Sequence, residues 1–199
     1  MAKPVAKEIP YRDPVAAFQP FAGDPVAVLL DSADEGGGRG RYAYIAADPA
    51  ETLTDGPDGL RTRDPFGKLR ALLHMVRLDT DPALPPFQTG LCGVLGYELG
   101  GAIERLPDHR SGTEFPAIAV GLYDTIVAFD TFERRAWVIA ADLVTGRPSA
   151  ARRLESMSGR IAAAGALPPL DRAPVADWHW EMDRSAYEAA VQRAIDYIY

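Results

Sequence analysis

The sequence predicts an α+β fold, with mostly antiparallel sheets and flanking helices. Three observations lead to this class. Short apolar runs of strand length recur along the chain, and the brief connections between them favour antiparallel pairing. Residues 64–76 and 149–164 instead have features of helices. The chain has 199 residues, of which 47% are hydrophobic and 25% charged, and this is typical of a soluble globular protein of one or two domains.

The first strands are predicted by apolar runs that end at turn residues. Residues 25–32 (PVAVLLDS) suit a short buried strand. Residues 41–47 (RYAYIAA) predict a second strand, rich in aromatic side chains, that ends at Asp48-Pro49. Residues 51–63 predict a hairpin, because ETLT and LRTR flank the turn residues DGPDG.

A helix is predicted directly after this hairpin. Asp64 suits the capping position before a helix, and Pro65 suits the first helical position because its missing N–H has no partner there. The apolar face of the helix is expected to comprise Phe66, Leu69, Leu72, Leu73 and Val76.

Residues 87–107 (FQTGLCGVLGYELGGAIERLP) contain an unusual number of glycines for a strand or a helix. Each glycine costs backbone entropy on folding, so glycines persist where another chain segment comes close or where φ is positive. The segment therefore predicts a closely packed strand that turns sharply into a helix. Cys92 lies in its apolar part, with no histidine near in sequence, and is predicted to be a buried packing residue.

The second half predicts two long strands, residues 117–130 and 136–141, joined at residues 131–135. A helix, a linker and a further strand follow at residues 149–164, 167–174 and 177–182.

A last helix starts near Asp183 or Ser185, either of which can cap it. Its apolar stripe comprises Tyr187, Val191, Ala194, Ile195 and Ile198. No glycine, proline or basic last turn closes this helix, and nothing follows to cover the stripe. We therefore interpret the chain as the front part of a longer protein.

Composition excludes several classes of function. The net charge of −7 argues against a general nucleic-acid binder, whose phosphate contacts require basic residues. No apolar run reaches the length of a membrane span, and the N-terminus lacks the apolar core of a signal peptide. The single cysteine excludes an internal disulfide framework and suits a reducing compartment. We expect a cytoplasmic protein with no nucleic-acid or membrane partner.

Few residues have the spacing of a catalytic or metal site. The loop that contains residues 34–41 (DEGGGRGR) is glycine-rich, but it lacks the ending of a phosphate-binding loop and joins two predicted strands. His74, His109 and His179 lie far apart, with no cysteine or acidic residue at ligand spacing, so no metal site is predicted. No catalytic residue is assigned.

One set of polar residues suits a small zwitterion. Asp31 and Ser32 end one predicted strand, and Arg39, Gly40, Arg41 and Tyr42 begin the next. If the two strands pair, acceptors for an ammonium group and donors for a carboxylate converge at one end of the pair. A salt-linked surface turn is the alternative interpretation.

Five segments, in this order and spacing, resemble the N-terminal half of chorismate-utilising enzymes. These are component I of anthranilate synthase and component I of aminodeoxychorismate (para-aminobenzoate) synthase. The segments are PVAVLLDS, RYAYIAADPAETL, PFQTGLCGVLGYELGGAIERLP, FPAIAVGLYDTIVAFD and WHWEMDRSAYEAAVQRAIDYI. The resemblance implies a fold of the anthranilate synthase component I N-terminal type over residues 1–174. Residues 175–199 would then begin a catalytic domain.

The resemblance also implies a reaction. Phe115-Pro116 with the AIAVGLYD that follows, together with DWHWEM, favours the para-aminobenzoate branch. There, a glutamine amidotransferase subunit supplies ammonia, and chorismate is aminated in a magnesium-dependent step to 4-amino-4-deoxychorismate for folate synthesis. The catalytic and magnesium-binding residues would lie beyond Tyr199. Anthranilate synthase component I and a stand-alone amino-acid-binding module without catalysis are the alternatives.

In the same family, a Leu-Leu-acid-Ser strand end holds L-tryptophan. The resemblance carries this pocket to Asp31 and Ser32, after Leu29-Leu30, and to Arg39, Gly40, Arg41 and Tyr42 on the next strand. This is the same set that suits a zwitterion by its own chemistry. Aspartate here replaces the glutamate usual in the anthranilate branch.

Overall fold

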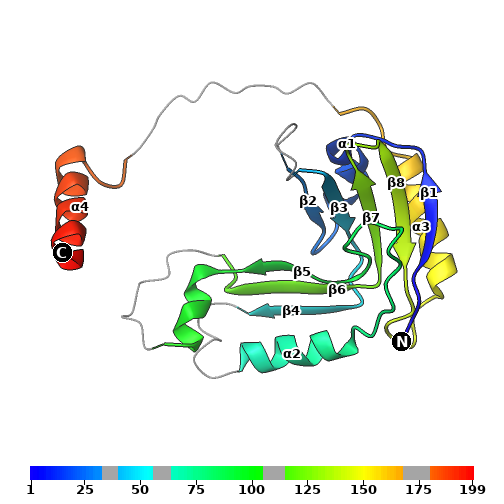
Figure 1. Cartoon of the computed structure of the whole chain (residues 1–199), viewed down its shortest axis with the longest axis horizontal. Helices are drawn as coiled ribbons and strands as arrows, with labels where there is room; N and C mark the ends of the chain where they lie inside the picture. Colours follow the sequence, from blue (N-terminus) through cyan, green and yellow to red (C-terminus); the bar gives the residue numbers. More distant parts are fainter. Residues whose placement is uncertain (33–39, 56–63, 105–114, 168–179) are drawn as a thin grey trace. The chain divides into compact units, whose positions relative to one another are not determined.

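The computed structural model describes residues 1–32, 40–55, 64–104, 115–167 and 180–199. The chain divides into two compact units, Met1–Leu167 and Pro168–Tyr199 (Figure 1). The first unit contains two antiparallel sheets with flanking helices, which confirms the predicted α+β class. The predicted boundary between residues 174 and 175 lies outside the described residues.

The larger sheet has five strands in the order β1-β8-β7-β3-β2, all paired antiparallel. Its members in that order are Val5–Ile9, Arg135–Ala140, Thr125–Asp130, Tyr42–Ala46 and Val28–Leu30. The predicted strands at residues 25–32 and 41–47 correspond to β2 and β3. Strand β1 was not predicted, because its sequence VAKEI sits on the sheet edge with mostly exposed side chains and shows no apolar alternation.

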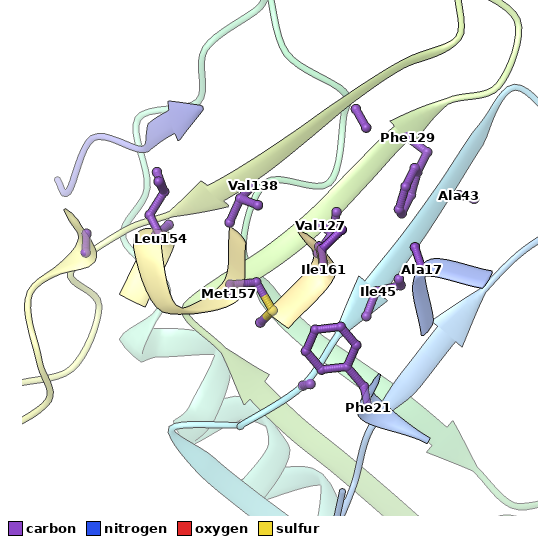
Figure 2. Close-up of a cluster of buried hydrophobic side chains, with 14 residues drawn as sticks. Ala17, Phe21, Ala43, Ile45, Val127, Phe129, Val138, Leu154, Met157 and Ile161 are labelled. Carbon is purple, nitrogen blue, oxygen red and sulfur yellow. The ribbon is translucent and has the colours of Figure 1, made fainter. Parts of the chain in front are cut away.

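Helices cover one face of this sheet (Figure 1). They are α1 (Pro14–Phe18), the 3₁₀ helix η1 (Gln19–Phe21) and α3 (Ala150–Ala162). The apolar side of α3 packs Leu154, Met157 and Ile161 into a core that also contains Phe21 and Phe129 (Figure 2). The predicted helix at residues 149–164 is therefore confirmed. Its spacing of three and four residues places these side chains on one face.

The smaller sheet has the order β4-β6-β5, comprising Glu51–Asp55, Ile118–Tyr123 and Gly90–Leu95. Helix α2 (Pro65–Met75) packs Leu69 and Leu72 against this sheet. Its cap is as predicted, since the Asp64 carboxylate accepts a hydrogen bond of 2.7 Å from the Gly67 N–H. Leu73 was assigned to the apolar face wrongly, because 53% of it is exposed.

Two predictions about strand connections need correction. The first arm of the predicted hairpin at residues 51–63 is β4, which pairs with β6, and the second arm lies outside the described residues. The single long strand predicted at residues 117–130 is wrong, because the chain passes from β6 to β7 in the other sheet at Asp124. Both strands are buried on both faces, so a continuous apolar run hides the break between them.

The glycine-rich segment confirms the predicted close packing. A Cβ atom on Gly93 of β5 would lie 2.1 Å from the Ala119 carbonyl oxygen of β6. The sharp turn after the strand leads into a 3₁₀ helix, η3 (Tyr97–Ala102). Cys92 is half-buried against the cluster around Tyr123, and burial raises the pKa of its thiol. The thiolate is therefore disfavoured, which agrees with a packing role.

In the second unit, Asp183 caps α4 (Arg184–Ile198) by accepting a hydrogen bond of 2.8 Å from the Ala186 N–H. The predicted apolar stripe is present on this helix, and Tyr187, Val191, Ile195 and Ile198 are exposed. Residues 180–182 form no strand, so the strand predicted at residues 177–182 is wrong in its described part. Within the described residues, no helix has the length and apolarity required to cross a bilayer.

Candidate amino-acid-binding site

The strands that carry the predicted zwitterion site do pair. In the antiparallel register of β2 and β3, Leu30 lies opposite Tyr44. Asp31 and Ser32 therefore leave β2 at the end of the pair where Arg41 and Tyr42 enter β3. The structure thus meets the condition on which the site was predicted. Arg39 lies outside the described residues.

A row of aromatic side chains lies beside this strand end. The Tyr42 and Tyr44 rings are 6.4 Å apart between centroids, and Tyr44 meets Phe87 edge-on at 5.5 Å. The Phe87 N–H also donates a hydrogen bond of 3.4 Å to the Tyr44 hydroxyl. Leu30, opposite Tyr44, is 44% exposed at the edge of this row. Together these side chains make an apolar wall at the predicted site, which we call the aromatic wall (Leu30, Tyr42, Tyr44 and Phe87).

Tyr44 and Phe87 were missed from the sequence. The signal for Tyr44 was present, because alternate residues of a strand share a face and RYAYIAA places Tyr42 and Tyr44 two positions apart. Phe87 arrives from the segment before β5, and no local pattern links it to β3. Burial raises the pKa of the Tyr44 phenol although the hydrogen bond from Phe87 opposes this, so the hydroxyl stays protonated.

The Arg41 guanidinium is paired with a carboxylate of the protein itself. Its Nε and Nη2 atoms donate to Oδ2 of Asp130 at 2.8 and 2.6 Å. The other Asp130 oxygen accepts from the N–H groups of Phe132 and Glu133 at 3.1 and 3.0 Å. Although burial alone would raise the pKa of Asp130, these hydrogen bonds lower it below its usual range. Arg41 thus anchors the start of β3 to the end of β7.

The turn after β7 holds the same strand start from the backbone side. The Thr131 hydroxyl is 3.0 Å from the carbonyl oxygens of both Gly40 and Arg41, and the Thr131 N–H donates to the Arg41 oxygen at 2.8 Å. Gly40 is buried at this contact. Of the predicted donors, Gly40 and Arg41 are therefore held in place by Thr131 and Asp130. Tyr42 follows them directly and contributes an aromatic ring.

The two acceptors of the predicted set are exposed at the rim. Burial raises the pKa of Tyr11, the charge of Arg134 opposes this, and the carboxylates of Asp13, Asp31 and Asp130 add to it. Tyr11 packs edge-on against Phe129 in the helix-covered core, on the face of the sheet opposite the aromatic wall. Asp31 and Ser32 follow Leu30 directly at this strand end.

This arrangement suits binding rather than chemistry. It offers an aromatic wall, a carboxylate and a hydroxyl at its rim, and a fixed strand start. Such a mixture of an apolar surface and few polar groups is typical of a small-molecule site. Within the described residues, no group of three or more histidine, cysteine or acidic side chains could hold a metal ion.

Comparison with known proteins now assigns the family. The sequence profile described as chorismate binding enzyme matches residues 26–199. The chain belongs to this family. Aminodeoxychorismate synthase component 1 of Klebsiella aerogenes is 27% identical over 201 residues, which cover 94% of this chain and 42% of that protein. Anthranilate synthase component 1 of Thermus thermophilus is 31% identical over 199 residues, covering 93% and 41%.

A third relative, anthranilate synthase component 1 of Synechocystis, is 32% identical over 145 residues, which cover 65% of this chain and 28% of that protein. The chain thus spans less than half the length of these relatives. They carry two different names at similar identity, so the comparisons assign the chorismate-utilising family and leave the branch to experiment.

Proposed function

We propose that this chain is the N-terminal part of an aminodeoxychorismate synthase component I. This enzyme, a transferase, aminates chorismate to 4-amino-4-deoxychorismate for para-aminobenzoate and folate synthesis. The observation that supports it is the match of 94% of this chain to the Klebsiella aerogenes protein of that name. We further propose that the partner is a glutamine amidotransferase that supplies ammonia, and that the protein is cytoplasmic.

The chain's own contribution would be binding. We propose that L-tryptophan lies with its indole on the aromatic wall and its polar end toward Ser32 and Asp31. Aromatic pairs favour edge-on or offset contacts, and Tyr42 and Tyr44 lie beside the strand end, with the Arg41 guanidinium 5.2 Å from the centroid of the Tyr42 ring. Because Arg41 is already paired with Asp130, the ligand carboxylate would be met by Ser32 and backbone N–H groups near Gly40.

The magnesium that the family implies does not fit the described part of this chain. Among those residues no cluster of metal ligands exists. We therefore assign no step of the amination to any residue here.

The reaction is tested with a longer form of the protein that includes the sequence after Tyr199. Chorismate, magnesium and an ammonium salt are supplied, and the product is identified by chromatography and mass. We expect 4-amino-4-deoxychorismate without release of pyruvate. Anthranilate with pyruvate would assign the protein to the other branch, and no turnover with either product would contradict the enzymatic proposal.

Anthranilate synthase component I is the second candidate. It is favoured by the match of 93% of this chain to the Thermus thermophilus protein of that name, at 31% identity. A binding module without catalysis is the third. The same assay separates all three, because each predicts a different product or none.

Tryptophan binding is tested separately by calorimetry on the 199-residue chain. We expect Ser32→Ala to weaken L-tryptophan binding by about fivefold to tenfold, the effect of one lost hydrogen bond. Ser149→Ala, at an exposed serine before α3 whose side chain makes no capping hydrogen bond, is the matched control and should bind as the wild type does. Equal affinity of the Ser32 variant and the wild type would remove Ser32 from the site.

A further inference from the structure

A cavity lies at the opposite end of β2 and β3 from the aromatic wall. Its volume is about 730 Å³. It is bounded by the segment that leads into β2, the segment between β3 and β4, and one side of α3. We call it the α3 groove. Neither the proposed reaction nor the tryptophan site uses it.

The α3 groove is rich in arginine, although the chain as a whole is acidic. Four arginines line it, namely Arg147, Arg152, Arg153 and Arg160, against two aspartates, Asp24 and Asp48. Two further carboxylates pair with these arginines: Asp124, fully buried, lies 3.0 Å from Arg147 and 3.1 Å from Arg153, and Asp142 lies 3.3 Å from Arg153. Because the chain as a whole has a net charge of −7, this concentration of arginine is a local exception. Three of the four arginines are paired with carboxylates, so a ligand anion would be recognised by the arginine donors that these pairs leave over.

Two of these arginines are fully engaged in the protein. Arg153 Nε lies 3.1 Å from Asp124 Oδ1, and its Nη2 donates to the Ala141 carbonyl oxygen at 2.7 Å. The Nη1 and Nη2 atoms of Arg160 bind Asp24 and the Pro20 carbonyl oxygen, both at 2.7 Å. The guanidinium groups of these two arginines therefore stabilise the walls of the groove and have few free donors for a ligand.

The other two also line the groove and retain donors that no described residue uses. Arg147 uses Nε toward Asp124 at 3.0 Å and Nη2 toward Asp48 at 2.7 Å, which leaves Nη1. Arg152 is exposed and makes no hydrogen bond or ion pair with any described residue. A guanidinium presents paired N–H donors that match a carboxylate or phosphate. Arg152 thus offers an unpaired guanidinium to a ligand, and Arg147, which lines the same groove, has one nitrogen left.

The backbone around the groove is held in an unfavourable conformation. Within the described residues, three that are not glycine have positive φ, and two of them, Val26 at 54° and Asp48 at 55°, line the groove. Positive φ is a genuine outlier for a β-branched residue such as valine. The Tyr123 hydroxyl donates to the Val26 carbonyl oxygen, and burial raises the pKa of Tyr123 to about 12, so this donor stays protonated.

Strained residues of this kind persist where the surrounding structure holds them, and they gather at functional sites. Val26 also presents an apolar side chain to the groove, together with Pro49 and Met157. The groove therefore joins an apolar surface to free cationic donors.

We propose that the α3 groove binds a small organic anion. Its carboxylate or phosphate group pairs with Arg152 and Arg147, and its apolar part lies on Val26, Pro49 and Met157. The site is separate from the aromatic wall and has its own ligand.

Benzoate, which combines a carboxylate with an apolar ring, is the probe. Calorimetry on the 199-residue chain compares it with benzamide, which has the same ring without the charge, and with acetate, which has the charge without the ring. We expect benzoate to bind at least about tenfold more tightly than either, since both parts contribute. Equal binding of benzoate and benzamide, equal binding of benzoate and acetate, or no benzoate binding would overturn the proposal.

Variants locate the site. Arg152→Gln should weaken benzoate binding about tenfold, and because Arg152 is exposed and unpaired the melting temperature should not change. Arg70→Gln, at an exposed arginine of α2, is the matched control and should bind as the wild type does. If Ser32→Ala weakens benzoate binding and Arg152→Gln does not, the ligand lies at the aromatic wall and the proposal is wrong.

Discussion

Strands β7 and β5 have the same length and a similar apolar character, yet their surroundings differ. Every residue of β7 is buried, between β3 and β8 and beneath the helices. In β5 only the first residue is buried, and Val94 and Leu95 at its far end are 45% and 53% exposed. An apolar sequence therefore predicts that a strand forms, but its burial depends on the neighbouring strands and helices that pack against it.

The difference in burial should appear as a difference in stability. Phe129 of β7 is fully buried in the helix-covered core. Phe129→Ala should lower the free energy of unfolding by about 3–5 kcal/mol, because it removes buried contacts and leaves a cavity. Urea denaturation followed by circular dichroism measures this. A loss below 1 kcal/mol would contradict the description of β7 as the centre of the core.

Gly93 shows that β5 nonetheless has one tightly constrained point. Gly93→Ala should cost about 2–3 kcal/mol, because the new Cβ would lie 2.1 Å from the Ala119 carbonyl oxygen and force β5 from β6. Gly101→Ala is the matched control, since a Cβ there meets nothing within 4 Å. The same denaturation experiment compares them. Equal losses for the two variants would show that the strands do not approach so closely.

The ion pair between Asp130, at the end of β7, and Arg41 should contribute to the stability of the fold. Asp130→Asn should cost about 1–2 kcal/mol at neutral pH, because it weakens the pairing with Arg41. The folded protein holds the pKa of Asp130 below its unfolded value, so its contribution is present above about pH 4 and is lost as pH falls further.

The measurement is the free energy of unfolding of both proteins between pH 7 and pH 2.5. The wild type should lose more stability than the variant over the acid part of this range. Parallel curves would show that the carboxylate of Asp130 gains nothing from Arg41 on folding.

The smallest effect is expected beyond the far end of β5. Tyr97, at the start of η3, is 93% exposed, so Tyr97→Ala should change the free energy of unfolding by no more than about 0.5 kcal/mol. A larger loss in the 199-residue chain would mean that Tyr97 packs against the protein, and the contrast with β7 would be weaker than described.

Local patterns in the sequence predicted the elements that depend on local physics. The cap at Asp64, strand β3 and the amphipathic α3 each follow from a few neighbouring residues. The break at Asp124 could not be predicted in this way. A buried carboxylate is stabilised there by Arg147 and Arg153, which lie more than twenty residues later.

In the candidate site, too, some features follow from the local sequence and others depend on distant residues. Pairing of the two strand ends was predictable from their sequences, as was the position of Tyr42. The engagement of Arg41 was not, since its partner Asp130 is 89 residues away. Phe87 of the aromatic wall likewise arrives from a distant segment, so its role becomes visible only in the folded chain.

Asp124 also sets an order of events during synthesis of the chain. It leaves water completely at the crossing between the sheets, and an unpaired buried carboxylate is strongly unfavourable. Its two cationic partners emerge only when Arg147 and Arg153 have been made. We expect the crossing between the two sheets to remain unsettled on the ribosome until both arginines have been released.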